Sequence, residues 1–285
     1  MKLIECPRDA MQGIKAFIPT EKKVEYLKQI LQCGFDTVDI GSFVSPHAIP
    51  QMADTPLLLA SLANEVYTSK LLVIVANLRG AQEACMFEQI HYLGYPFSVS
   101  ETFQKRNTNT SIEQSLLQLD KIKNISVKSG KELVVYLSMA FGNPYGDPWG
   151  ADEVLQWAEK MVQMEIKIIS LADTIGVAKP STITYLFKEV TKAFKDIEFG
   201  AHFHTTPQSW KEKITSAYEA NCRRFDGAIK GFGGCPMADD KLVGNMPTER
   251  LIEFCDEHKL STGLNMESFN RSFQLADAVF STNHE

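Results

Sequence analysis

The chain has 285 residues, a length that suits one large α/β barrel of about 250 residues better than one small domain. Its hydrophobic fraction of 44% and charged fraction of 22% are ordinary for a globular protein. The net charge of −6 argues against a nucleic-acid partner, and no apolar run approaches the ~18 residues of a membrane span.

Cysteine usage and the N-terminal segment indicate the compartment. The six cysteines are scattered and form no CxxC pair, so we expect reduced thiols. The chain begins with the strand-like segment "KLIEC" and shows no signal-peptide pattern. Both features predict a cytoplasmic protein.

Short apolar runs alternate with amphipathic stretches along the chain. Most of the runs lack clean alternation, which is typical of parallel strands covered on both faces. The predicted strands are 3–6, 37–42, 71–76, 96–100, 132–140, 166–172, 197–204 and 223–229. Helical periodicity predicts helices at about 54–66, 80–91, 181–195, 208–221 and 247–258, and Thr110 and Glu113 have capping-box spacing before a further helix.

Eight repeats of strand and helix predict a (β/α)8 TIM barrel, with a doubly wound open sheet as the alternative. No linker, low-complexity tract or fixed-period repeat divides the chain. We therefore expect a single domain over residues 1–285, with a helical appendage from about residue 260.

Polar residues fall where the predicted strands end. In a TIM barrel these ends form one face, which carries the chemistry. The residues concerned are Arg8 and Asp9 after the first strand, Asp39 and Ser42 on the second, Ser170 and Asp173 around the end of the sixth, and His202 and His204 on the seventh.

The two histidines stand in the stretch "GAHFHTT". Residues two apart on a strand face the same side, so His202 and His204 are either two metal ligands or two hydrogen-bonded members of a polar layer. Asp9 lies two strands away in a closed barrel, and Asn245 follows the eighth strand. Two imidazoles, a carboxylate and an amide oxygen suit Mg²⁺ or Mn²⁺ and favour the metal interpretation.

The segment after the eighth strand, Lys230 to Asn245, is long and rich in glycine. Loops of this length in compact domains are usually functional or disordered. It lacks the Lys-Ser/Thr pair of a nucleotide-binding P-loop. Cys235 at its centre is a candidate for acid–base or nucleophilic work.

Several motifs together resemble the 3-hydroxy-3-methylglutaryl-CoA lyase family, within a wider group of metal-dependent TIM-barrel lyases and aldolases. They are "PRDAMQ", "SFVSPHAIPQMAD", "SETFQKRN", "SLADTIGVAKP", "HFH", "GFGGCP" and "GNMPTE", in the family's order and spacing. The resemblance extends from Glu5 to about Leu264.

The resemblance implies a retro-Claisen cleavage of an acyl-CoA by a homodimer that uses Mg²⁺ or Mn²⁺. It implies Asp9, His202, His204 and Asn245 as metal ligands, with Glu249 behind them. Arg8 would stabilise the thioester enolate, Cys235 would donate a proton, and Asp9 or His202 would be the base. Substrate contacts would come from Asp39, Ser42, Asn107, Ser170 and Asp173.

Some positions depart from the family pattern. Thr205 replaces an acidic residue after the second histidine, so a carboxylate that could orient the histidines is expected to be missing. Asp39 replaces a glutamate, and Ile229 and Lys230 stand where small or apolar residues are usual. These changes leave two alternatives open, namely a related lyase or aldolase for another hydroxyacyl thioester or hydroxy acid, and a barrel that binds metal without turnover.

Overall fold

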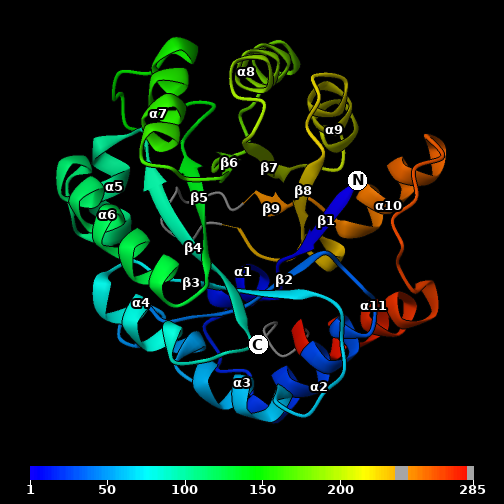
Figure 1. Ribbon diagram of the computed structural model, residues 1–285. Coiled ribbons are helices and arrows are strands. Elements are labelled where there is room, and N and C mark those ends of the chain that lie inside the picture. The colour runs from blue at the N-terminus through cyan, green and yellow to red at the C-terminus, as the bar shows by residue number, and fades with distance from the viewer. Residues whose placement is uncertain (235–242, 281–285) are drawn as a thin grey trace.

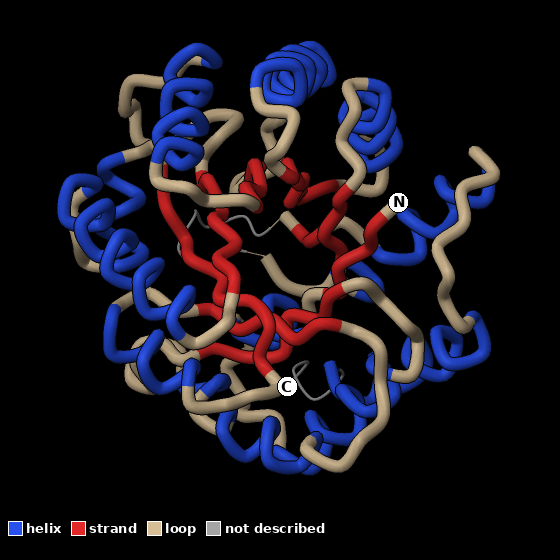
Figure 2. Tube along the Cα trace, in the orientation of Figure 1, coloured by secondary structure: helices blue, strands red, loops and turns tan. Residues whose placement is uncertain are grey.

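The structure is a closed barrel of eight parallel strands inside a ring of helices (Figures 1 and 2). It is a computed structural model and describes residues 1–234 and 243–280. The strands are β1 (Lys2–Glu5), β2 (Thr37–Ser42), β3 (Lys70–Ile74), β4 (Ile90–Ser98), β5 (Glu132–Ser138), β6 (Ile168–Asp173), β7 (Glu198–Thr205) and β8 (Arg224–Gly227). Each strand pairs with its neighbours in chain order, and the β8–β1 pairing closes the ring, which confirms the predicted barrel.

The helices lie around the barrel and cover its outer face, except α1 (Pro7–Gln12), which lies within the ring of strands in the view of Figure 1. They are α1 (Pro7–Gln12), α2 (Thr20–Leu31), α3 (Thr55–Leu62), α4 (Leu78–Cys85), α5 (Glu101–Thr108), α6 (Ile112–Lys128), α7 (Ala151–Gln163), α8 (Pro180–Ala193), α9 (Trp210–Glu219), α10 (Thr248–Glu257) and α11 (Met266–Phe280), with 3-10 turns η1 (Pro50–Met52) and η2 (Ile229–Gly231). Among the described residues, none of these helices combines the length and the apolar character needed to cross a bilayer.

The predicted capping box is present one residue later than expected. The Ser111 side chain accepts from the backbone of Gln114, and the Gln114 side chain accepts in return from the backbone of Ser111. Thr110 does not cap the helix because its hydroxyl bonds to the hydroxyl of Thr108. Helix α6 therefore begins at Ile112.

The prediction of the fourth strand at 96–100 is wrong at its start, because β4 spans Ile90–Ser98. The strand begins at Ile90, because α4 ends at Cys85 and not near residue 91. Gly94 interrupts the apolar pattern, and an added Cβ there would lie 2.5 Å from Cδ1 of Ile74 on β3, so the Ile74 side chain would have to shift. A contact with a side chain of the neighbouring strand is a tertiary constraint that the local pattern does not reveal.

A ninth strand, β9 (Gly244–Asn245), was not predicted. It is two residues long and pairs antiparallel with the end of β7, so that Asn245 lies opposite His204 (Figure 1). The chain thereby returns over the mouth of the barrel after the long loop.

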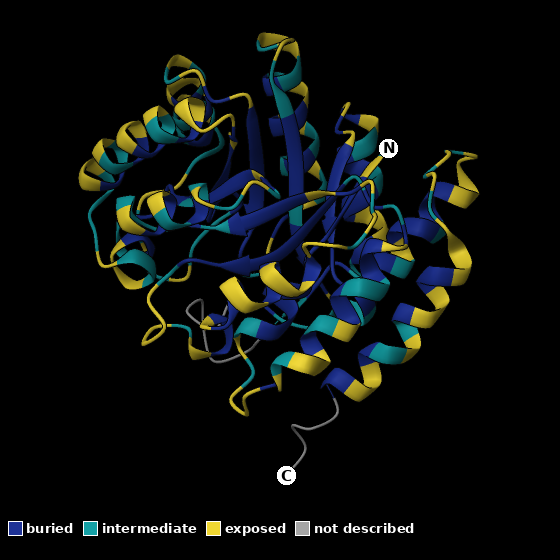
Figure 3. Cartoon of the chain, turned by 60° about the horizontal axis from the view of Figure 1, so that its bottom comes forward, coloured by how far each residue is buried: buried dark blue, intermediate teal, exposed yellow. Residues whose placement is uncertain are grey.

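The main apolar core lies between the sheet and the helices, which bury one face each (Figure 3). Inside the barrel the lining is divided. A small apolar cluster of Leu72, Tyr92, Val134, Tyr136 and Ile168 comes from β3, β4, β5 and β6. On the opposite side, β7, β8 and β2 contribute His202, Asp226, Arg224 and Asp39. The polar half of the lining is where the candidate site forms.

The C-terminal helix α11 packs on α2 and completes the ring of helices (Figure 1). Phe280 meets Tyr26 edge-on with ring centroids 5.9 Å apart, and Phe269 meets Phe35 at 6.5 Å. The helical appendage expected from about residue 260 is therefore present, and its apolar face is part of the barrel's outer packing.

Glu5 is a buried carboxyl on the helix-facing side of β1. It accepts hydrogen bonds from the backbone of Ile229 at 2.9 Å and from the hydroxyl of Thr248 at 2.5 Å. Burial raises the pKa of Glu5 from 4.5 to about 8, against the hydrogen bonds from Thr248 and Ile229, while the charge of Glu249 adds to the rise. Glu5 therefore joins β1 to the two segments that flank the long loop.

This raised pKa predicts that the stability of the protein falls with pH. Stability from Glu5 is full below its unfolded pKa of 4.5 and is lost as pH rises through about 8, because the folded state binds the proton more tightly. Between about pH 5 and about pH 9, the free energy of unfolding of wild type, measured with urea, should fall by on the order of a few kcal/mol more than that of Glu5→Gln. The exposed Glu113→Gln is the control, and parallel curves for wild type and Glu5→Gln would contradict the prediction.

Candidate functional site

The site is built where β1, β7 and β8 end. His202 and His204 share the inward face of β7, and Asp9 lies in the first turns of α1, which begins directly after β1 with Pro7. Ligand atoms of Asp9, His202 and His204 all lie within 4.8 Å of one another. The structure thus brings these three predicted residues into one cluster.

Asn245 joins this cluster through β9. Its amide Nδ2 donates to Oδ2 of Asp9 at 2.8 Å and to the carbonyl of Phe232 at 2.9 Å. These contacts use the amide nitrogen, which leaves the side-chain carbonyl as the oxygen that could bind a cation. Asn245 therefore lies beside Asp9, with its amide nitrogen turned toward that carboxylate.

The protonation states of Asp9 and His204 suit a cation. Burial would raise the pKa of Asp9, but the charges of Arg8, His202 and His204 hold it below its usual value. Burial and the neighbouring charge of His202 lower the pKa of His204 to about 4. Near neutral pH, the site therefore offers a carboxylate and a neutral imidazole.

Arg8 is held between two carboxylates. Its Nε and Nη2 donate to Oδ2 of Asp39 at 3.0 and 2.6 Å, and its Nη1 donates to Oδ1 of Asp9 at 2.9 Å. Gln12 accepts a further bond from Nη1 at 2.8 Å. The guanidinium is thus fixed beside the histidine cluster, with its charge balanced from two sides.

Asp39 is coupled to Arg8 through one oxygen only. Its other oxygen, Oδ1, is buried and has no partner among the described residues. Burial raises the pKa of Asp39 to about 6, although the charge of Arg8 opposes the rise. Asp39, which stands where the family has a glutamate, is therefore the carboxyl that positions Arg8.

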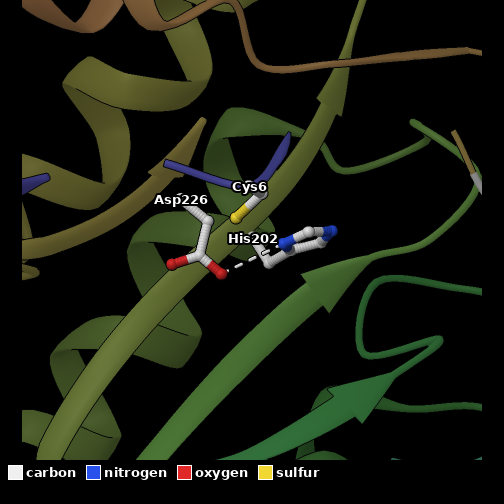
Figure 4. A group of neighbouring side chains, drawn as sticks. All are labelled: Cys6, His202 and Asp226. Atoms are coloured by element: carbon white, nitrogen blue, oxygen red, sulfur yellow. Dashed lines mark hydrogen bonds and ion pairs between the residues drawn. The ribbon is translucent and has the colours of Figure 1, made fainter. Parts of the chain in front are cut away.

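Asp226 is a site residue that the sequence reasoning missed (Figure 4). Its Oδ2 lies 3.1 Å from Nδ1 of His202, because β7 and β8 pair with His202 opposite Asp226. Burial would lower the pKa of His202, but the hydrogen bond and charge of Asp226 raise it overall. The one available signal was an aspartate within the short apolar strand "RRFDGAI".

The expectation that no carboxylate orients the histidines is therefore wrong for His202. Thr205 lacks one, and its hydroxyl donates at 3.5 Å to the backbone carbonyl of Asn245. Asp226 supplies the carboxylate from the neighbouring strand instead. Carboxylates that accept from the second ring nitrogen of a histidine fix its tautomer and orientation.

Asp173 lies apart from this cluster. It faces the helices, where Lys213 of α9 donates to its Oδ2 at 2.5 Å and the backbone of Ala178 donates to its Oδ1 at 3.1 Å. Lys213 also donates to the backbone carbonyl of His204 at 2.9 Å. Asp173 thus supports the end of β7 through Lys213.

Glu249 lies at the base of the loop. Its carboxylate accepts from the backbone of Lys230 at 3.0 Å, and no contact recorded for the described residues joins it to Asp9 or the histidines. Lys230 has a left-handed φ of 62° and directs its ammonium to Asp277 and the ring of Phe273, both on α11. Lys230 therefore connects the start of the loop to the C-terminal helix α11.

The remaining predicted residues are distributed around the barrel mouth or outside the described residues. Ser170 lies inside the barrel, and its buried hydroxyl has no partner among the described residues. The Ser42 hydroxyl accepts at 3.2 Å from the backbone of Val44. Asn107 is partly exposed on α5. Cys235 lies outside the described residues.

Comparison with known proteins identifies the family. The HMGL-like family model matches residues 3–275. The chain belongs to the HMGL-like family. The resemblance seen in the motifs is thereby confirmed.

Relatives in this family include named lyases. The chain is 30% identical over 269 residues to a cytoplasmic 3-hydroxy-3-methylglutaryl-CoA lyase of Rattus norvegicus, covering 93% of this chain and 77% of that one. It is 29% identical over 269 residues to the hydroxymethylglutaryl-CoA lyase YngG of Bacillus subtilis, covering 92% and 86%.

Solved structures agree with the sequence relatives. An HMG-CoA lyase from Acinetobacter baumannii, in complex with coenzyme A and 3-methylmalate, has a TM-score of 0.90 and 27% identity, and covers 99% of this chain and 91% of that one. The HMG-CoA lyase of Bacillus subtilis also has a TM-score of 0.90, with 27% identity and coverage of 97% and 92%.

The contact between Asp226 and His202 makes a direct prediction for the metal-free protein. Replacing Asp226 by Asn removes a negative charge and a hydrogen-bond acceptor and should lower the pKa of His202. A pH titration of ¹⁵N-labelled imidazoles by NMR would measure the change. Asp256→Asn, an exposed change on α10, is the control. An unaltered pKa in Asp226→Asn would contradict the assigned pair.

Proposed function

We propose that this protein is a divalent-metal-dependent lyase that cleaves 3-hydroxy-3-methylglutaryl-CoA to acetyl-CoA and acetoacetate. The observation that carries the proposal is the placement of Arg8 directly beside the cluster of Asp9, His202, His204 and Asn245. Its family membership and the names of its relatives support the same activity.

Asp9, His202, His204 and Asn245 would hold the cation. An ionised carboxylate, a neutral imidazole and an amide oxygen in one buried cluster fit a hard or borderline divalent ion, and we propose Mg²⁺ or Mn²⁺. A cation there supplies positive charge that lowers the cost of deprotonating the tertiary hydroxyl of the substrate.

His202 is the better of the two candidate bases. Asp9 is already occupied, because its carboxylate accepts from Arg8, Gln12 and Asn245 and its pKa is held low. The pKa of His202 is raised, and Asp226 is positioned to stabilise its protonated ring. As a ligand, His202 would use its one free ring nitrogen on the cation, so it can take the hydroxyl proton only when that nitrogen is not bound to the cation; Asp226 positions the ring in both cases.

Arg8 would stabilise the enolate that remains after the carbon–carbon bond breaks. Asp39 and Asp9 hold its guanidinium before substrate arrives, so no reorganisation is required as charge develops on the thioester oxygen. Cys235 would then protonate the enolate carbon from the loop that follows β8. Asp39, Ser42, Ser170 and Asn107 would contact the substrate, and Asp173 would act only through Lys213.

A second candidate, a related lyase acting on another 3-hydroxyacyl thioester, is favoured by Asp39. The side chain is one methylene shorter than the family glutamate, and its Oδ1 has no partner among the described residues. A different acyl group could use that oxygen. A panel of 3-hydroxyacyl-CoA substrates distinguishes the two candidates.

We also propose that the protein acts as a homodimer in the cytoplasm. The relatives include both cytoplasmic and mitochondrial enzymes, so the compartment rests on the sequence pattern alone. Sedimentation velocity of the purified protein would test the dimer.

The deciding experiment is acetyl-CoA release from 3-hydroxy-3-methylglutaryl-CoA by metal-stripped protein. Release that depends on added Mg²⁺ or Mn²⁺ is the expected result, since the donor set is complete. Folded protein that binds Mn²⁺ but releases no acetyl-CoA would refute the proposed substrate.

Arg8→Lys should separate electrostatic stabilisation from metal binding. Lysine keeps the charge but cannot direct two N–H groups to Asp39 while reaching Asp9. We expect kcat to fall by about 10²–10³, as for loss of one fixed stabilising donor. Mn²⁺ affinity, measured by calorimetry, should change little. Arg79→Lys on the exposed face of α4 is the control, and equal losses in both variants would contradict the role of Arg8.

A further inference from the structure

Beside the proposed metal ligands lies a second group of donor atoms, which shares His202 with them and includes a thiol, Cys6, that the proposed reaction does not use. Ligand atoms of Cys6, His202 and Asp226 all lie within 4.8 Å of one another (Figure 4). The three residues come from the end of β1, from β7 and from β8. Cys6 and Asp226 are 1% and 3% exposed.

The side chains converge on one point. In Figure 4 the sulfur of Cys6 and the carboxylate of Asp226 face the same edge of the His202 ring, and the second ring nitrogen points away from both. One oxygen of Asp226 bonds to Nδ1 of His202, while Oδ1 is buried without a partner among the described residues. A buried carboxylate oxygen without a hydrogen-bond partner is costly, so Oδ1 is an acceptor that a further ligand would satisfy.

The donor types select a class of ion. A thiolate, an imidazole nitrogen and a carboxylate oxygen together prefer Zn²⁺ or Cd²⁺ to Mg²⁺, because sulfur is a soft ligand. Three protein donors with one open position are also the donor count of zinc sites that retain a water. The cluster of Asp9, His204 and Asn245 contains no sulfur and has the opposite preference.

His202 belongs both to the group around Asp9 and to the group around Cys6. The chemistry of its ring prevents ions from binding to both groups at the same time. A neutral imidazole has one nitrogen with a free lone pair, and the other carries a proton. With Nδ1–H donating to Asp226, the other nitrogen is free for the ion at Asp9. An ion at Nδ1 requires the proton on the other nitrogen, and His202 is then lost as a ligand at Asp9.

We propose that Cys6, His202 and Asp226 form a second, inhibitory site for a thiophilic divalent cation of the zinc class, which excludes the hard ion from the neighbouring site. Binding forms bonds from the ion to Sγ of Cys6, Nδ1 of His202 and an oxygen of Asp226. The thiol proton leaves to solvent, and the imidazole proton moves from Nδ1 to the other ring nitrogen, so one proton is released per ion.

The first test uses Cd²⁺ and needs no enzyme activity. One equivalent of Cd²⁺ added to the metal-free, full-length protein should produce the ultraviolet charge-transfer absorption of a cadmium–thiolate bond. The absorption should disappear in Cys6→Ala and persist in Cys33→Ala, whose thiol is equally buried but contacts Ser272. Equal absorption in Cys6→Ala, or none in wild type, would overturn the site.

The second test addresses exclusion. The free-ion electron paramagnetic resonance signal of Mn²⁺ should rise when one equivalent of Cd²⁺ is added to Mn²⁺-loaded wild type. In Cys6→Ala, at least about tenfold more Cd²⁺ should be needed for the same release, as for loss of one ligand-shell contact. Equal release from both proteins would overturn the proposal, because Cd²⁺ would then be replacing Mn²⁺ directly.

Cys6→Ser serves as a second variant that preserves volume, with circular dichroism to verify that both variants fold. The first cadmium measurement is independent of the proposed function, whereas the second rests on the proposed Mn²⁺ site at Asp9; neither requires the lyase reaction, so loss of activity and loss of the cadmium site are distinguishable. If the lyase activity is present, Zn²⁺ should inhibit wild type at about tenfold lower concentration than Cys6→Ala. Equal inhibition of both would contradict the inhibitory role.

Discussion

The buried ion group of Arg8, Asp9 and Asp39 is the constraint on which the site depends. Removing charges from water costs several kcal/mol for each ion unless they are paired and hydrogen-bonded. One guanidinium between two carboxylates leaves one negative charge, and the imidazole of His204 does not offset it, because its pKa is lowered to about 4. The remaining negative charge beside Asp9 favours a cation there, in agreement with the proposed chemistry.

Apolar and ionisable side chains occupy different halves of the barrel interior. Apolar side chains from β3 to β6 fill one half of the interior, while β1, β2, β7 and β8 carry the ionisable groups. This division places the reacting groups in a low-dielectric environment, where a fixed charge acts more strongly than in water. It also brings Cys6 and Asp226 beside His202, which is therefore the shared member of the two proposed ion sites.

The segments around the long loop are secured from outside the barrel. Glu5 and Glu249 accept from the backbone of consecutive residues, Ile229 and Lys230, and Lys230 reaches α11. Ile229 and Lys230, which both depart from the family pattern, are therefore linked to the C-terminal helix α11 through Lys230. A change in α11 would be transmitted to the loop stem, and hence to the position from which Cys235 is proposed to act.

The sequence by itself determined the barrel, the inward pair of histidines and the identity of the metal-ligand candidates, because the strand period and the order of motifs are local properties. It misplaced the start of β4 and missed β9 and Asp226. Gly94 serves a contact with Ile74, Asn245 reaches His204 by antiparallel pairing, and Asp226 meets His202 through the register of β7 and β8. Likewise, only the fold decided that Asp173 faces Lys213 and not the mouth. Register and the direction of side chains across strands depend on pairing between distant segments, which no local pattern contains.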